Sequence, residues 1–301
     1  MSLEQFTQKK FDEKFKEVYD ELTKNKTSVH FPKGILLGGQ PGSGKTTIHF
    51  VVRENNPNII VINGDDFRSY HPNFSKLQKK YGNDAVKYTQ KFSNQMVECL
   101  IDKLSSKKYN LLIEGTLRTT GTPLNTYNLL KSKGYSVELS VMAVSKEVSW
   151  QGTINRFNEM QSMGLTPRAT PKESHDVVVN NIVQNLDELY KLNKFDNITL
   201  YNRNQECLYS MQDTPNVNPA PILSNIVHGK NILEEKKSNT LSWDSFNQAD
   251  ETHNENVVKN PYKVEGCTPV SQKVDRNISN EAKNNNSISK DIDKSKKTTK
   301  L

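Results

Sequence analysis

The feature that most constrains this chain is a glycine-rich segment directly after a short apolar run. Residues 34–37 read Gly-Ile-Leu-Leu, and residues 38–47 read Gly-Gly-Gln-Pro-Gly-Ser-Gly-Lys-Thr-Thr. The pattern G-x-x-x-x-G-K-[ST] is carried here by Gly39, Gly44, Lys45 and Thr46. A buried strand before the loop and a predicted helix at 46–53 after it complete the context of a P-loop, so the sequence predicts a phosphate-binding turn.

A P-loop binds phosphate mainly through its backbone. Glycines let the N–H groups curl around a phosphate because no Cβ lies in the way, and the following helix adds the positive end of its dipole. We expect Lys45 to reach the β- and γ-phosphates of a nucleotide and the Thr46 hydroxyl to ligate Mg²⁺. The alternative, a turn without a ligand, has no use for the Gly-Lys-Thr ending. The predicted nucleotide-binding residues are Gly39, Gln40, Pro41, Gly42, Ser43, Gly44, Lys45, Thr46 and Thr47.

Length and composition limit the class of protein. A chain of 301 residues could hold one large or two modest domains, and its mean hydropathy of −0.75 predicts that part of it lies outside any core. The net charge of +7 favours anionic partners, either nucleic acid or small phosphorylated ligands. The three cysteines form no C-x-x-C, and no apolar run resembles a signal peptide or membrane span. We therefore expect a soluble, cytoplasmic protein without a membrane partner.

Four apolar runs predict a mostly parallel sheet flanked by helices: 34–37, 58–63, 109–114 and 136–144. In such sheets ligands bind beyond the carboxyl ends of the strands. The second run is followed by Asp65, a candidate to orient or deprotonate an acceptor hydroxyl, and by Asp66, for which a helix-capping role is equally plausible. The third run ends at Glu114, the position of a Walker-B carboxylate, and Arg118 follows where it could meet a bound anion or Glu114 itself.

Two arginines flank a segment that could close over the site. Arg156 lies on a predicted helix at 146–163, and Arg168 stands between two prolines in the loop that follows. Planar guanidinium groups match phosphate oxygens, so the pair is typical of a lid that closes on a transferred phosphoryl group. The alternative is two solvated arginines in a basic protein.

A histidine and an aspartate are adjacent on the next predicted helix, at 172–192. His175 beside Asp176 suggests catalysis, but adjacent residues on a helix point apart. The spacing therefore favours a structural role for the histidine.

The composition changes near residue 214. Residues 1–213 read as a P-loop kinase domain that starts with an amphipathic helix within 1–30 and ends in a hairpin at 198–201 and 206–209. Residues 214–301 read as a low-complexity, largely disordered tail with one amphipathic stretch at 222–233. The tail holds part of the positive charge without interleaved aromatic side chains, so we expect no nucleic-acid partner.

Taken in order, these segments resemble the zeta toxins of bacterial epsilon/zeta toxin–antitoxin systems, including the PezT branch. The resemblance runs from about residue 33 to residue 210 with nearly constant spacing, so it is more specific than the P-loop alone. The matching segments are 38–46, 63–67, 70–74, 92–98, 109–116, 118–120, 134–135, 141–144, 152–157, 168–171 and 175–176.

The resemblance implies a kinase that uses ATP and Mg²⁺ to phosphorylate the 3′-hydroxyl of the amino sugar of UDP-N-acetylglucosamine and so blocks peptidoglycan synthesis. It implies that Asp65 is the base for the sugar hydroxyl and that Arg156 and Arg168 contact the transferred phosphate. The implied partner is a small helical epsilon-type antitoxin that docks over the ATP site. The implied substrate-binding residues are Glu98, Glu114, Thr116, Arg118 and Thr126.

Two alternatives remain beside this interpretation. One is another small P-loop kinase that acts on a nucleotide, a nucleic-acid end, an antibiotic or a metabolite. The other is a catalytically silent nucleotide-binding partner of an antitoxin, which the presence of Lys45, Thr46, Asp65 and Glu114 disfavours.

Overall fold

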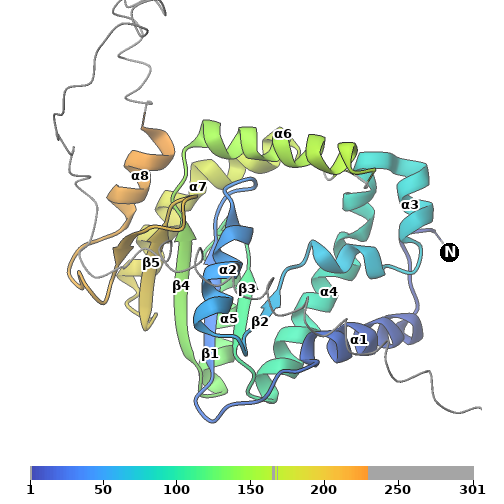
Figure 1. The fold of residues 1–301 in the computed structure, drawn as a ribbon, viewed down its shortest axis with the longest axis horizontal. Coiled ribbons are helices and arrows are strands. Elements are labelled where there is room, and N and C mark those ends of the chain that lie inside the picture. Colours follow the sequence, from blue (N-terminus) through green and yellow to red (C-terminus); the bar gives the residue numbers. More distant parts are fainter. Residues whose placement is uncertain (1, 165–166, 168, 230–301) are drawn as a thin grey trace, which may run out of the picture. The chain divides into compact units, whose positions relative to one another are not determined.

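The computed structural model describes residues 2–164, 167 and 169–229, and these form an α/β fold around one six-stranded sheet (Figure 1). The strand order is β2-β3-β1-β4-β5-β6, in which β6 alone runs antiparallel to its neighbour. The strands are β1 Lys33–Gly38, β2 Ile60–Ile62, β3 Leu111–Glu114, β4 Ser136–Met142, β5 Asn197–Tyr201 and β6 Cys207–Ser210. The predicted mostly parallel sheet is thereby confirmed, and the predicted terminal hairpin is the β5–β6 pair.

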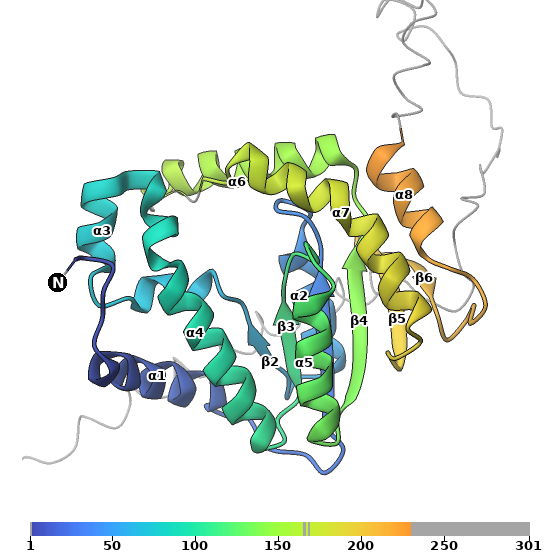
Figure 2. The ribbon, with the colours of Figure 1, turned by 180° about the vertical axis from the view of Figure 1, so that it is seen from behind.

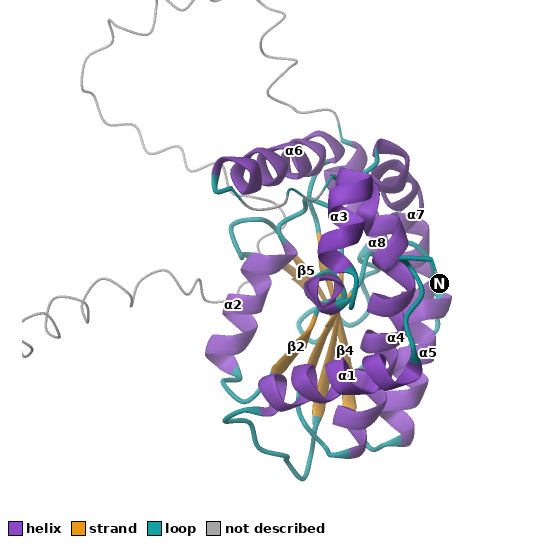
Figure 3. Ribbon diagram, turned by 90° about the vertical axis from the view of Figure 1, so that its right-hand side faces the viewer, coloured by secondary structure: helices purple, strands orange, loops and turns teal. Residues whose placement is uncertain are grey.

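Helices cover both faces of this sheet. The α-helices are α1 Gln8–Thr23, α2 Lys45–Asn55, α3 Phe74–Tyr81, α4 Ala85–Ser106, α5 Gly121–Ser132, α6 Lys146–Ser162, α7 Lys172–Lys191 and α8 Ala220–His228. Two short 3₁₀ helices, η1 Asp66–Tyr70 and η2 Gly82–Asp84, connect β2 to α4 around α3. Figure 2 shows α4, α5 and α7 against one face, and Figure 3 shows α2 on the other.

The core is divided by the sheet because side chains of a strand alternate between its faces. In β1, Ile35 and Leu37 join a smaller apolar cluster with Ile48 of α2. Leu36, between them, joins the larger cluster with residues of α4 and α7 on the opposite face. The residues of β2 and the first three residues of β3 are buried as well, so these strands have both faces covered, which explains why their sequences read as continuous apolar runs.

The register of the sheet brings the ends of β1 and β3 together. Leu37 is paired with Glu114, and the N–H of Gly115 donates to the Leu37 carbonyl at 2.8 Å. The loop after β1 and the carboxylate at the end of β3 therefore emerge side by side at the carboxyl edge of the sheet, where ligands bind in folds of this kind.

The last described helix lies beyond the predicted domain boundary. Helix α8 begins after residue 214 and packs on α7, with Ala220, Leu223 and Val227 buried. It overlaps the predicted amphipathic stretch at 222–233, whereas residues 230–301, the rest of the predicted tail, lie outside the described residues. In the described part of the chain, the helices are too short or too polar to cross a membrane.

Candidate functional site

The glycine-rich loop joins β1 to α2 in a conformation that requires glycine. Gly42 and Gly44 have φ angles of 74° and 89°, and Gly44 directly precedes the first turn of α2. A Cβ on Gly42 would lie 2.1 Å from the carbonyl oxygen of Ser149 on α6, so a side chain has no room there. A glycine-rich turn that leads directly into the start of a helix is the arrangement of an anion site.

The lysine of the motif is buried inside this loop. Its Nζ donates to the carbonyl oxygens of Gly39 and Gln40 at 2.9 and 3.1 Å and lies 3.8 Å from Glu114 Oε1. Burial lowers the pKa of Lys45, and nearby Glu114 opposes that shift. A phosphate bound at the loop would place further negative charge beside the ammonium group of Lys45, which its two carbonyl partners hold inside the loop.

Not every residue of the motif offers its side chain. The Gln40 amide is buried and donates to the Val144 carbonyl at 2.6 Å, which ties the loop to the end of β4. The Ser43 side chain is buried, and the Thr47 hydroxyl donates to the Gly44 carbonyl at 2.7 Å. Thr46, in contrast, is exposed at the start of α2. These positions therefore offer a ligand their backbone, together with the hydroxyl of Thr46.

Glu114 has a histidine partner that the sequence did not reveal. His49 Nε2 lies 2.9 Å from Glu114 Oε2, an ion-pair distance, although the two groups are not aligned as a hydrogen bond. Burial raises the pKa of Glu114, but His49 and Lys45 outweigh it and hold this pKa below its ordinary value of 4.5. His49 follows Lys45 by four residues on α2, so both face the same carboxylate. That spacing is the signal that could have identified it.

This depressed pKa makes a prediction about acid stability. Ionised Glu114 stabilises the fold above pH 4.5, and its contribution is lost as the pH falls through the lower folded pKa. We expect the difference in unfolding free energy between the wild type and Glu114→Gln to shrink from about pH 5 to about pH 3. Urea titrations monitored by circular dichroism measure it, and a difference that stays constant over this range would contradict the assignment.

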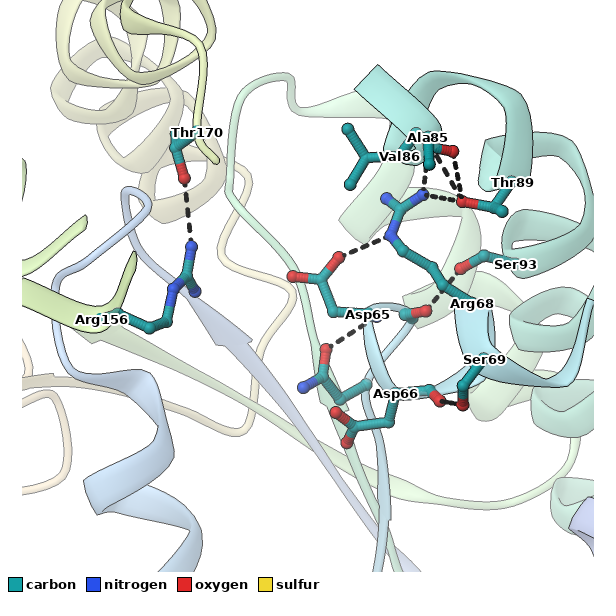
Figure 4. Close-up of polar contacts among 12 residues, drawn as sticks. Asp65, Asp66, Arg68, Ser69, Ala85, Val86, Thr89, Ser93, Arg156 and Thr170 are labelled. Atoms are coloured by element: carbon teal, nitrogen blue, oxygen red, sulfur yellow. Dashed lines mark hydrogen bonds and ion pairs between the residues drawn. The ribbon is translucent and has the colours of Figure 1, made fainter. Parts of the chain in front are cut away.

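A small cavity of about 220 Å³ opens over the glycine-rich loop. Thr46 and Glu114 line it, and Arg156 enters it from α6. Arg156 donates to the Thr170 hydroxyl at 3.1 Å, a contact that spans the segment between α6 and α7 (Figure 4). The cavity therefore gathers Lys45 and Arg156 with four oxygen-bearing side chains, those of Thr46, Glu114, Asn155 and Glu159. The second predicted lid arginine, Arg168, lies outside the described residues.

A larger cavity of about 430 Å³ adjoins the first. The five residues predicted for the acceptor side all line it: Glu98, Glu114, Thr116, Arg118 and Thr126. Gln90 and Asn94 of α4 also line it and were missed, because the sequence gives a polar position on a helix no distinguishing mark. Glu114 lines both cavities, so one carboxylate forms part of the wall between them. The Glu114 carboxylate lies within 4 Å of Lys45 and His49, whereas Arg118 lines the larger cavity.

Asp65 is held at the start of η1 by neighbouring groups (Figure 4). Its N–H donates to Asn63 Oδ1 at 3.1 Å, and its carboxylate accepts from Arg68 Nε at 2.9 Å. Arg68 is fixed in turn by donation to the Val86 carbonyl at 2.8 Å. The positioning role of Arg68 was missed. Arg68 follows Asp65 by three residues in a predicted turn, and this spacing does not show which way the arginine side chain points.

Asp65 lines a third cavity, of about 380 Å³, and not the acceptor-side cavity itself. Gly64 beside it does line the acceptor-side cavity, so Asp65 directly follows a residue of that cavity along the chain. The charge of Asp65 also contributes to the pKa values of Lys45 and Glu114, which places it within electrostatic reach of both. The structure thus brings Asp65 to the edge of the predicted site.

Helix α6 holds the loop from the other side through a close glycine contact. A Cβ on Gly152 would lie 2.3 Å from the carbonyl oxygen of Gly42. We expect Gly152→Ala to lower the melting temperature and weaken nucleotide binding at least severalfold, because either α6 or the loop must move. Gly121→Ala is the matched control, since a Cβ at the start of α5 would meet nothing within 4 Å. Equal stability and nucleotide affinity of the two variants would contradict this role of Gly152.

His175 joins α7 to α6 inside the protein. The fully buried ring contacts Ser149 Oγ at 2.9 Å through Nε2 and Asp176 Oδ1 at 3.2 Å through Nδ1. The expectation that the two adjacent side chains point apart is therefore wrong, because a histidine ring can turn back along its own helix. Burial lowers the pKa of His175, with Asp176 opposing. Its inaccessibility agrees with the predicted structural role.

Comparisons with known proteins agree with this arrangement. Residues 16–214 match the protein family described as Zeta toxin. The chain is 44% identical over 227 residues to toxin zeta of Streptococcus agalactiae, covering 75% of this chain and 79% of that protein. It is 42% identical over 239 residues to toxin PezT of Streptococcus pneumoniae serotype 4, covering 79% of this chain and 94% of that protein.

A solved structure shows the same similarity in three dimensions. It comes from a study of the PezAT chromosomal toxin–antitoxin system of Streptococcus pneumoniae and superimposes with a TM-score of 0.70 at 39% identity. The superposition covers 79% of this chain and 94% of that chain. The residues that line the two adjoining cavities all lie within the range matched by the family.

Proposed function

The chain belongs to the zeta toxin family, and we propose that it is the toxin of a toxin–antitoxin system that acts as a kinase of UDP-N-acetylglucosamine. The proposed reaction transfers a phosphoryl group from ATP to the 3′-hydroxyl of the amino sugar. The observation that carries the proposal is the shared wall at Glu114, which separates the cavity over the P-loop from a larger cavity lined by all five predicted acceptor residues.

The donor half of the site fits a nucleotide and a magnesium ion. Gly42 lets the loop pack closely against α6, where a Cβ would lie 2.1 Å from the Ser149 carbonyl oxygen, and Lys45 offers a positive charge inside the loop. The Thr46 hydroxyl and the Glu114 carboxylate are hard oxygen donors of the kind Mg²⁺ prefers. When bound, ATP supplies the phosphoryl group and Mg²⁺ neutralises part of its charge. Arg156 adds a planar donor that can contact the phosphoryl oxygens.

The acceptor half supplies alignment and a proton acceptor. We assign to Asp65 the role of receiving or orienting the proton of the attacking hydroxyl, with Arg68 holding its carboxylate in place. The volume of about 430 Å³ lies in the range of small-molecule sites. Glu98, Thr116 and Thr126 offer hydrogen bonds to sugar and base, and Arg118 offers a positive charge to the acceptor's diphosphate.

The test is an acceptor panel with the purified chain, ATP and Mg²⁺. ADP release and a phosphorylated product should appear with UDP-N-acetylglucosamine and not with other nucleotides, aminoglycosides or free N-acetylglucosamine. Product formed only with a different acceptor would favour another P-loop kinase. ATP binding without product from any acceptor would favour a catalytically silent binding module.

We also propose a small helical antitoxin as the partner of this chain. The related structure from the PezAT toxin–antitoxin system supports this assignment. Expression of the chain alone should arrest bacterial growth, and co-expression of the protein encoded beside it should restore growth. Unimpaired growth on expression of the active chain alone would contradict the toxin assignment.

A further inference from the structure

A third cationic side chain, that of Arg203, reaches the cavity over the P-loop from the side of the sheet formed by β5 and β6. Arg203 lies in the turn between β5 and β6 and lines this cavity together with Lys45 and Arg156. Its Nε would lie 3.4 Å from a Cβ on Gly44, and one terminal nitrogen would lie 3.3 Å from a Cβ on Gly152. The guanidinium group therefore stands directly between the start of α2 and the middle of α6.

The turn that carries Arg203 is tightly organised. Asn202 Oδ1 accepts from the N–H groups of Asn204 and Glu206 at 2.9 and 3.0 Å, and Asn202 Nδ2 donates to the Glu206 carboxylate at 2.6 Å. Gln205 takes a left-handed φ of 66° to close the turn. Arg203 is thus presented by a turn with a fixed backbone rather than by a long loop.

The strand order decides which part of a nucleotide Arg203 can meet. Asp65 follows β2 and Glu114 ends β3, both on one side of β1, whereas Arg203 follows β5, on the other side. The transferred phosphoryl group must point toward Asp65, where the acceptor is proposed to bind. The nucleoside end of the donor must then extend over β4 and β5, toward Arg203.

We propose that Arg203 binds the donor nucleotide at its nucleoside end, through the α-phosphate or the face of the base. A guanidinium group suits both, because its planar N–H donors match phosphate oxygens and its face stacks on aromatic rings. The inference rests on the proposed function in that it requires a nucleotide in this cavity. It adds a donor-binding residue outside the P-loop and outside the segments that carry the family resemblance.

Calorimetric titration of the full chain with ADP and Mg²⁺ tests the proposal. We expect Arg203→Gln to weaken ADP binding by roughly tenfold or more, as for loss of a hydrogen bond to a charged group, and Arg203→Lys to weaken it less. Arg203 is exposed, so neither change should unfold the protein. The matched control is Arg53→Gln, which removes an exposed arginine from the last turn of α2, far from its first turn, and should leave ADP affinity unchanged.

The outcomes separate this inference from the proposed function. Wild-type affinity in Arg203→Gln would overturn the role of Arg203 while leaving the nucleotide site in place. Failure of the wild type to bind ADP would instead overturn the nucleotide site itself. In steady-state assays, Arg203→Gln should raise the KM for ATP about tenfold and leave the KM for the acceptor unchanged. A fall in kcat with an unchanged KM for ATP would place Arg203 at the transferred phosphoryl group and overturn the assignment to the nucleoside end.

Discussion

Replacing Lys45 with methionine should reduce phosphoryl transfer by roughly 10³-fold while the protein stays folded. The lysine is buried in the loop, 3.8 Å from Glu114, so its charge is placed where the phosphates would lie and is little screened by solvent. Methionine fills a similar volume and removes the charge. Initial rates with ATP and UDP-N-acetylglucosamine measure the loss, and circular dichroism measures the melting temperature.

The control for this variant is Lys16→Met on α1. Lys16 pairs with Asp20 on the surface, with 79% of its side chain exposed, so its loss should leave the rate unchanged. If Lys45→Met retained the wild-type rate, the P-loop would not be the donor site and the proposed mechanism would fail.

Replacing Asp65 with asparagine should lower kcat by roughly 10³-fold and leave ADP affinity within about twofold of the wild type. Asparagine keeps the shape of the side chain but cannot accept the hydroxyl proton. We expect unchanged ADP affinity because Asp65 follows β2 whereas the P-loop follows β1, and β3 lies between these two strands. Rapid-quench assays give kcat, and calorimetric titration gives the affinity for ADP.

Asp84→Asn provides the matched control for Asp65→Asn. Asp84 pairs with Lys87 at the start of α4, and each side chain is 65% exposed. We expect wild-type kcat from this variant. An Asp65→Asn protein with undiminished kcat would exclude Asp65 as the proton acceptor.

The contacts of α6 explain how distant segments come to one site. Near its middle, α6 lies against the P-loop, where Gly152 leaves room for the Gly42 carbonyl. The contact between His175 and Ser149 then ties α7 to the same part of α6, and the bond from Arg156 to Thr170 spans the segment between the two helices. Arg156 is thus positioned by the packing of α6 against the P-loop and by its hydrogen bond to Thr170.

The electrostatics of the site depend on a cluster that no local pattern describes. Lys45 and His49 project from α2 onto the carboxylate of Glu114 at the end of β3. These two partners keep Glu114 ionised although burial favours its neutral form. The carboxylate is thereby kept negative at the boundary between the two cavities, where a metal ion or a substrate hydroxyl could meet it.

Much of the fold could be predicted from local sequence. Continuous apolar runs indicated strands with both faces covered, and the β5–β6 hairpin followed from two apolar runs around a polar turn. The predicted kinase domain ended at residue 213, whereas helix α8, Ala220–His228, packs on α7 beyond that residue. The apolar face of α8 is only three buried residues long, and such a short pattern shows its role only when α7 lies beside it.

The sequence by itself determined the donor half of the candidate site, because a P-loop is a property of consecutive residues. Spacing, glycine φ angles and the start of α2 are all fixed within ten residues of Gly39. Asp65 and Glu114 followed from the rule that strand ends bear ligands in parallel sheets.

Only the tertiary structure decided which distant groups share the site. The contact of His49 with Glu114, the bond from Arg68 to the Val86 carbonyl and the approach of Arg203 to Gly44 depend on strand order and helix packing. These contacts join segments whose separation along the chain carries no signal of their proximity. The physical reason is that the backbone geometry of a few consecutive residues determines a local motif. The order and packing of the strands and helices determine which side chains line the two adjoining cavities.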